Sequence, residues 1–221
     1  MSDERRGPTS RFAQLVSGRD GALNLDEACL LIAAHARPGL DVEGALSVLD
    51  RLAEGIDSFP AWHARLFTET GFTGDADDYH AVENSLLDRV LARRRGMPIT
   101  LAVVGLEVAR RAGVPMAGIG MPGHFLLRHT GEPGWFVDAF GGGELLDEAG
   151  CEALFRKIAD PGAAFRPEYL QPVGNRQIVA RILANLRYTY AAADDGVNLA
   201  WVLQLQLLIP DPALSERSRF N

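Results

Sequence analysis

Residues 96–115 read GMPITLAVVGLEVARRAGVP, and this stretch decides how the rest of the chain is arranged. Pro98 occupies the favoured first-turn position of a helix. The residues from Ile99 to Ala112 are apolar almost all round, and a helix of that kind must be covered on both sides. We therefore predict that this segment is the central helix of the core and that Gly113 ends it.

Helical periodicity dominates the chain before this stretch. The first ten or so residues are polar and are expected to fray, with order beginning near Phe12. Apolar residues at helical spacing then predict helices over 25–36, 41–56, 60–70 and 84–95. Gly96 stands where the C-cap of the last helix belongs.

The pattern changes after Gly113. Short apolar runs bounded by Gly and Pro are typical of strands, and they fall at 114–121, 124–128 and 135–140. Helical spacing returns at 147–158 and, after a proline-bearing connector over 161–172, at 176–193 and 197–208. We predict an α+β fold with a helical N-terminal region (1–80), a core of central helix plus antiparallel sheet (81–172) and a C-terminal helical hairpin packed on that core (173–221).

Composition narrows the class of partner. The formal charge of −7 and the pI near 5.2 disfavour nucleic acid and anionic membranes, since both are polyanions. Cys29 and Cys151 stand far apart, without a CxxC pair or a histidine-rich tract, so no metal site, cofactor or disulfide scaffold is expected. The charged N-terminus lacks the apolar stretch of a signal peptide. We expect a cytoplasmic protein with a protein or peptide partner; the oligomeric state is not indicated.

A histidine and an aspartate lie in two neighbouring predicted strands. If 128–134 is a hairpin loop, Leu127 faces Trp135 and His124 faces Asp138, with Cβ atoms about 4.5–5.5 Å apart. An imidazole bonded to a carboxylate is the second and third member of a catalytic triad. Alternatively, the two side chains simply satisfy each other at the end of a sheet.

The order of these pieces resembles the transglutaminase-like superfamily, whose pattern is Gly-x-Cys opening a helix, then Gly-Ile-Pro, His and Asp. The pieces here read Gly96-Met97-Pro98, Gly113-Val114-Pro115, His124 and Asp138. More narrowly, the chain is similar to SirB-type transglutaminase-like proteins in three stretches: ENSLLDRVLARRRGMPITLAVVGLEVARR (83–111), PGHFLLR (122–128) and WFVDAFGGGELL (135–146).

The resemblance implies a transglutaminase- or papain-like core and places Pro98 where active relatives carry the nucleophilic cysteine. It also implies tetratricopeptide-type repeats near the C-terminus, and 185–212 looks like one such helical hairpin. A single hairpin must pack on the main domain. We regard it as a candidate docking surface for a protein partner.

Two functions follow from the missing cysteine. Proline has no nucleophilic atom, so the first is a non-catalytic binding or regulatory protein that retains a vestigial His124–Asp138 dyad in a cleft also lined by Asn84, Thr100 and Gly123. The second is a residual amidase, protease or acyltransferase that uses a non-cysteine nucleophile such as Thr100, or water activated by His124. Thr100 lies about 200° around the helix from Pro98 and should point away from it. Asn84 is expected to cap a helix, and both cysteines to be structural.

Overall fold

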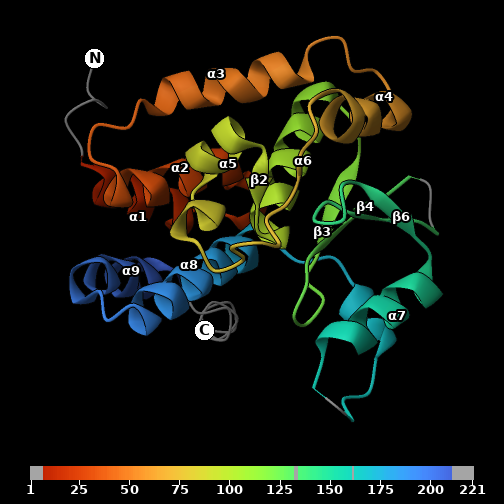
Figure 1. Cartoon of the computed structure of the whole chain (residues 1–221). Coiled ribbons are helices and arrows are strands. Elements are labelled where there is room, and N and C mark those ends of the chain that lie inside the picture. Colours follow the sequence, from red (N-terminus) through yellow and green to blue (C-terminus); the bar gives the residue numbers. More distant parts are fainter. Residues whose placement is uncertain (1–6, 132–133, 161, 211–221) are drawn as a thin grey trace, which may run out of the picture.

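A computed structural model describes residues 7–131, 134–160 and 162–210. Helices surround one central helix, and a small antiparallel sheet lies against that helix (Figure 1). The fold class is therefore α+β, as predicted. In the described part of the chain, no helix is both long and apolar enough to cross a lipid bilayer.

The central helix is α6 (Pro98–Ala112), with the predicted bounds. Pro98 begins it at the first turn, and Gly113 ends it in the left-handed conformation at φ 72°. Its flanks are covered by helices on one side and by the sheet on the other (Figure 1). This enclosure explains why nearly the whole helix is apolar.

The N-terminal helices are α1 (Pro8–Ser17), a short 3-10 turn (Asp20–Ala22), α2 (Leu25–Ala36), α3 (Val42–Ala53) and α4 (Phe59–His63). The expectation that the first ten residues fray is wrong for Pro8 onward, because Phe12 and Val16 are fully buried and anchor α1; residues 1–6 lie outside the described chain. The helix predicted over 60–70 changes into a π-helical segment, Ala64–Glu69.

The helix predicted over 84–95 is divided in two. A 3-10 helix (Val82–Ser85) is followed by extended Leu86 and then by α5 (Leu87–Arg93). Arg94, not Gly96, takes the left-handed C-cap conformation, at φ 58°. Gly96 lies instead in β2 (Arg95–Gly96), which pairs in parallel with β1 (Thr73–Gly74).

The main sheet consists of β3 (Met116–Ile119), β4 (Leu126–His129), β5 (Phe136–Asp138) and β6 (Glu144–Leu146), antiparallel and in chain order. The predicted register of β4 against β5 is wrong by two residues, because Leu127 lies opposite Val137 instead of Trp135. A shift of two leaves every side chain on its predicted face, since side chains alternate with a period of two. His124 precedes β4 and belongs to the loop that enters it.

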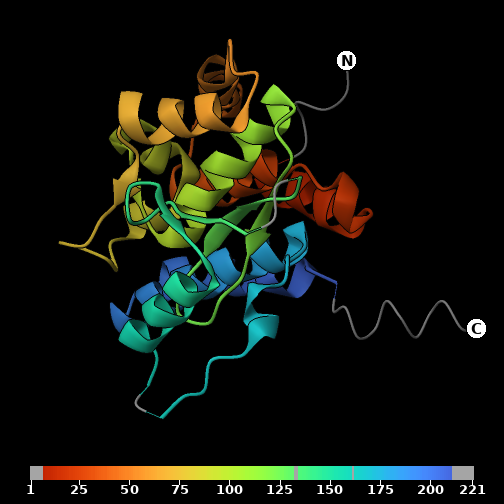
Figure 2. The same ribbon diagram turned by 90° about the vertical axis from the view of Figure 1, so that its right-hand side faces the viewer.

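The C-terminal third begins with α7 (Glu148–Ile158), capped by Asp147, and a 3-10 turn (Pro167–Leu170) within the predicted connector. The helices α8 (Asn175–Ala192) and α9 (Gly196–Leu208) pack against each other as a hairpin (Figure 2). The part of the predicted hairpin beyond residue 210 lies outside the described chain.

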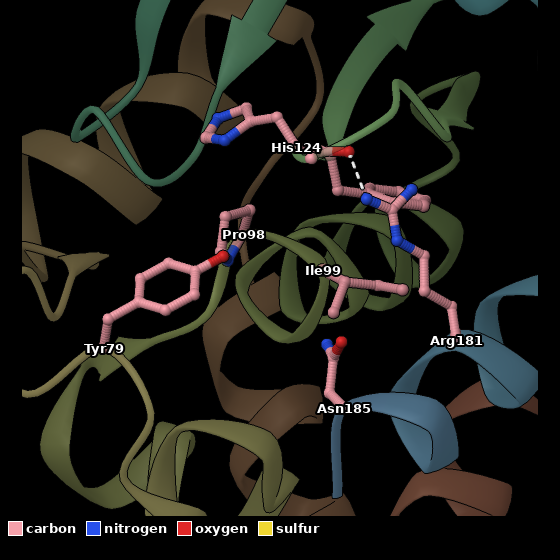
Figure 3. A pocket seen from close by; sticks show the side chains of 8 residues that line it. Tyr79, Pro98, Ile99, His124, Arg181 and Asn185 are labelled. Carbon is pink, nitrogen blue, oxygen red and sulfur yellow. Dashed lines mark hydrogen bonds between the residues drawn. The ribbon is translucent and has the colours of Figure 1, made fainter. Parts of the chain in front are cut away.

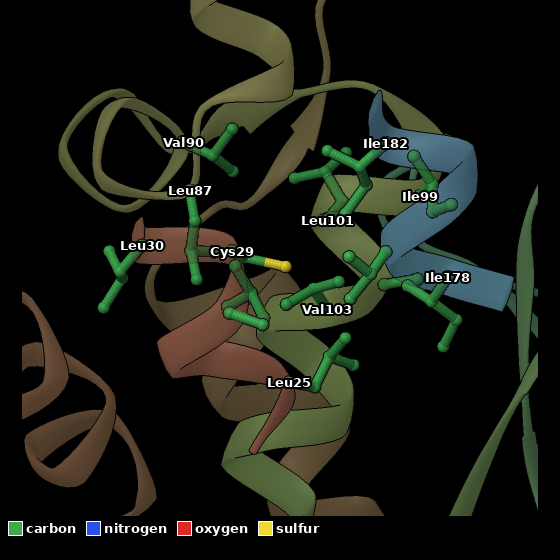
Figure 4. Packing of buried hydrophobic residues seen from close by; sticks show 14 of the residues in the cluster. Leu25, Cys29, Leu30, Leu87, Val90, Ile99, Leu101, Val103, Ile178 and Ile182 are labelled. Carbon is green, nitrogen blue, oxygen red and sulfur yellow. The ribbon is translucent and has the colours of Figure 1, made fainter. Parts of the chain in front are cut away.

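One hydrophobic cluster joins elements from all three predicted regions. Figure 4 shows Leu25 and Cys29 of α2, Leu87 of α5, Val103 of α6 and Ile178 of α8 in this cluster. A smaller cluster, which includes Ile119, Leu126 and Phe155, joins the sheet to α7. The division into three regions stays a prediction.

Candidate functional site

A small cavity opens at the N-terminal end of α6 (Figure 3). Its volume is about 130 Å³, and it is lined by the loop before β4, the first turn of α6, the segment before the 3-10 helix at 82–85, and α8. The side chains around it include Tyr79, Pro98, Ile99, His124, Arg181 and Asn185. Segments from distant parts of the sequence therefore meet at this helix end.

His124 and Asp138 form the predicted hydrogen bond. Nε2 of His124 lies 2.8 Å from Oδ1 of Asp138, and the two residues are 6% and 5% exposed. The same Oδ1 accepts the backbone N–H of Phe140 at 3.0 Å. The ring of Phe140 packs edge-on against the imidazole, with centroids 6.0 Å apart. The carboxylate and this ring together fix the orientation of His124.

The other ring nitrogen of His124 is directed toward α6. With Nε2 bonded to Asp138, Nδ1 lies on the side of the ring toward Pro98 (Figure 3). It has no hydrogen-bond partner among the described residues. An imidazole held in this way can accept a proton from a group in the cavity or donate one to it.

Pro98 provides no chemistry of its own at the helix end. It stands at the first position of α6, and Met97 before it supplies no side-chain cap. The backbone N–H groups of Ile99 and Thr100 belong to the first turn, where helix amides lack an intrahelical acceptor. Proline removes one such donor and fixes the chain in the geometry with which a helix begins.

The remaining predicted site residues are not all at the cavity. Gly123 lines it, at φ +76°. Thr100 is fully buried in α6, and its Oγ1 has no hydrogen-bond partner within the described chain. Asn84 is also fully buried, and neither it nor Thr100 lines the cavity.

Asn84 does not cap a helix. Its side chain instead holds the backbone of the loop that carries Tyr79, and Tyr79 lines the cavity. Its Nδ2 donates to the carbonyls of Asp78 at 2.7 Å and Tyr79 at 3.4 Å, and its Oδ1 accepts from Arg93 at 3.2 Å. Arg93 also pairs with the buried carboxylate of Asp75 at 2.7 Å. This network positions the loop that carries Tyr79.

Tyr79, Arg181 and Asn185 line the cavity, although no sequence pattern predicts them there. Nη2 of Arg181 donates to the carbonyls of Met121 at 3.0 Å and His124 at 2.8 Å, and its guanidinium lies over the ring of Phe125. Burial raises the pKa of Tyr79, against the opposing effect of the positive Arg181. Arginines are common on helices, so their identity alone gave no signal that this one reaches a cavity.

Neither cysteine can serve as a nucleophile at this site. Cys29 is buried in α2, and burial, together with the charges of Asp26 and Glu107, raises the pKa of its thiol well above the ordinary value. Burial and the nearby carboxylates raise the pKa of Cys151 to about 12. Both thiols therefore stay protonated near neutral pH. Within the described residues, no group of three or more His, Cys, Asp or Glu side chains is placed to hold a metal ion.

Comparison with known proteins identifies relatives for most of the chain. A model of the transglutaminase-like superfamily matches residues 40–184. A UPF0162 protein of Xylella fastidiosa is 37% identical over 190 residues, which is 79% of this chain and 68% of that protein. Protein SirB1 of Salmonella typhimurium is 29% identical over 126 residues, 56% of this chain and 46% of SirB1.

A shorter match extends to eukaryotes. F-box only protein 21 of Homo sapiens is 37% identical over 98 residues, which is 40% of this chain and 16% of that protein. No solved structure matches the chain significantly.

Proposed function

Because this chain belongs to the transglutaminase-like superfamily, we propose that it is a non-catalytic member, in which the site that performs acyl transfer in active members serves as a binding cavity. A single observation carries the proposal. Pro98 occupies the first turn of α6 beside the ring of His124, where a nucleophile would have to stand.

Among the residues that the structure describes, no substitute nucleophile is placed at the cavity, which supports the same proposal. Thr100 does not line the cavity, and both cysteine thiols are buried and protonated. The hydroxyl that does line it belongs to Tyr79, whose pKa is raised by burial, and a phenol that resists ionisation is a poor nucleophile. The proposed role is to hold a peptide or small ligand against His124.

We propose a cytoplasmic location, for which two unbridged cysteines are the support. We also propose that the α8–α9 hairpin, which resembles one tetratricopeptide-type unit, contacts a protein partner. Exposed apolar side chains on α9 support this role: Val197 is 82% exposed and Leu207 is 87% exposed.

Hydrolysis by activated water is the second candidate function. Nδ1 of His124 faces the cavity side of the ring, and a volume of about 130 Å³ has room for water. Asp138 would stabilise the imidazolium that forms when His124 takes a proton. This function requires no side-chain nucleophile.

Labelling with electrophilic probes tests the proposal. An iodoacetamide probe for thiols and a fluorophosphonate probe for hydroxyls would be applied to the wild-type protein, to His124→Ala and to the double variant Cys29→Ser with Cys151→Ser. We expect no labelling of any of the three. Labelling that disappears in His124→Ala would refute the non-catalytic function and locate the nucleophile.

A further inference from the structure

Arg181 stands at the cavity without an acidic partner. Among the described residues, no carboxylate lies within 4.0 Å of its guanidinium, whereas many of the other arginines described have an acidic partner. Burial lowers the pKa of Arg181, which reflects the cost of holding a charge away from water. A partly buried cation without a counter-ion is expected to bind an anion from outside the chain.

Two of the three guanidinium nitrogens of Arg181 are free to donate to an anion. Within the described residues, both hydrogen bonds of the guanidinium come from Nη2, to the carbonyls of Met121 and His124, so Nε and Nη1 have no acceptor there. The two carbonyls and the ring of Phe125 hold the guanidinium in place. Both bidentate edges of the guanidinium include Nη2, which the two carbonyls occupy, so the arginine presents a single charged N–H group to one oxygen of an anion such as a carboxylate.

The other residues that line the cavity add hydrogen-bond donors and no acidic side chain. Asn185 contributes an amide whose Nδ2, among the described residues, makes only a weak contact with the sulfur of Met97 at 3.4 Å, and Tyr79 contributes a hydroxyl. Asp138 does not line the cavity, and its Oδ1 is occupied by His124 and by the N–H of Phe140. This positive, donor-rich interior contrasts with the chain's formal charge of −7.

We propose that this cavity binds the carboxylate of a ligand, through one unused N–H of Arg181 with Asn185 and Tyr79 around it. The volume of about 130 Å³ admits one small group, such as the C-terminal carboxylate of a peptide or the end of an acidic side chain. The inference rests on the proposed binding function and names the chemistry of its ligand.

The test compares two probes that differ only in charge. N-acetylglycine and N-acetylglycinamide would each be titrated into the uniformly 15N-labelled chain while amide chemical shifts are recorded. We expect N-acetylglycine to shift the amides of Ile99, Gly123 and Phe125, and the neutral amide to bind at least about tenfold more weakly, because it lacks a charge-assisted hydrogen bond. This comparison uses the wild-type protein, so no variant needs to fold.

Single-residue variants then test whether Arg181 is the group that binds the carboxylate. Arg181→Gln should weaken binding of N-acetylglycine by about tenfold or more. Arg187→Gln, on the same helix but exposed, should leave it unchanged. Because Arg181 also holds two carbonyls, Arg181→Lys serves as a second variant. It keeps the positive charge and loses the fixed planar guanidinium, so its affinity for N-acetylglycine should fall between those of Arg181→Gln and the wild type.

Three outcomes would overturn the inference. Equal binding of the acid and the amide would show that charge is not recognised, while leaving the proposed binding function intact. Tighter binding of inorganic phosphate than of N-acetylglycine at the same amides would replace the carboxylate by a phosphate. No shift with any probe would remove the anion site, and the labelling experiment would still decide separately whether the chain is catalytic.

Discussion

Asp138 carries two hydrogen bonds on one oxygen, and this sets its structural role. Its Oδ1 accepts from His124, which is buried like Asp138 itself, and from the N–H of the partly buried Phe140. Asp138→Ala leaves both donors without an acceptor, so we expect a loss of about 1–3 kcal/mol in the free energy of unfolding, measured by urea denaturation. Glu144→Ala is the matched control, because Glu144 lies opposite Asp138 in β6 but is exposed. Equal losses in the two variants would contradict this role.

The two cysteines give a second prediction at the scale of single residues. Burial raises the pKa of both thiols, that of Cys151 to about 12, so at pH 8 only about one Cys151 thiol in ten thousand is ionised. We expect no reaction of the native protein with a chromogenic disulfide reagent, and two thiols to react after unfolding in urea. Fast reaction of a thiol in the native protein would contradict the buried positions.

The His124–Asp138 pair was predictable from sequence, whereas Arg181 was not. Strand alternation placed both members of the pair on one face, and the error of two residues in the register preserved that face. Arg181 reaches His124 across 57 residues of sequence, through the packing of α8 against the core. No local pattern encodes such a contact, because it depends on how separate elements pack.

At the scale of elements, the first turn of α6 allows a direct test of the proposal that Pro98 stands where active relatives carry a nucleophile. Pro98→Cys would place a thiol at a helix N-terminus beside His124, and both the helix end and an imidazolium stabilise a thiolate. We expect iodoacetamide to label this variant at pH 7, and labelling to slow by about tenfold or more when His124→Ala is added. The measurement is the rate of mass increase. Equal rates with and without His124 would mean that the imidazole does not reach the first turn.

A second element-scale prediction concerns Arg93, which joins α5 to the loop after β1. Burial raises the pKa of Asp75, but hydrogen bonds from Arg93, Asp78 and Asn84 outweigh it and lower the pKa below 3.8. Arg93→Ala should reduce the free energy of unfolding by about 1–3 kcal/mol, a range that allows for the partial exposure of Arg93. Arg95→Ala, which removes an exposed pair with Asp77 at 3.9 Å, should change little.

The pH dependence of the Arg93 effect has a definite sign. A carboxyl group with a lowered pKa in the folded state stabilises the protein above its unfolded pKa, and the contribution is lost as pH falls through the folded pKa. The difference between wild type and Arg93→Ala should therefore be full at neutral pH and should shrink below the ordinary value of 3.8. Urea denaturation at a series of pH values measures it, and a difference that grows on acidification would contradict the ion pair.

Sequence periodicity located most helices but not their internal breaks. The bounds of α6 follow from Pro98, the apolar run and Gly113, all of which act locally. The break in the helical pattern at Leu86 does not follow from local sequence. It depends on two contacts: the N–H of Met97 bonds to the carbonyl of Asn84, and β2 pairs with β1. These contacts join segments distant in sequence, and they override a helical pattern that continues through residue 95.

At the scale of the whole molecule, the shared core predicts that the C-terminal hairpin unfolds together with the rest. Leu205 of α9 belongs to the same hydrophobic cluster as Phe12 of α1 and Leu101 of α6. Leu205 is fully buried, whereas Leu207 on the same helix is 87% exposed. Leu205→Ala should therefore lower the free energy of unfolding by about 2–5 kcal/mol, and Leu207→Ala should change it by no more than about 0.5 kcal/mol.

The unfolding curves also test whether one core or several hold the chain together. If the cluster is one cooperative unit, far-UV circular dichroism and tryptophan fluorescence should give the same urea midpoint in the wild type and the same lower midpoint in Leu205→Ala. Fluorescence is informative because Trp62 is buried beside α6 and Trp201 lies on α9. An early transition confined to Trp201 would instead make the hairpin a separate unit. In that case α8 would remove Arg181 from the cavity when it detached, and ligand binding at the cavity would be lost before the core unfolded.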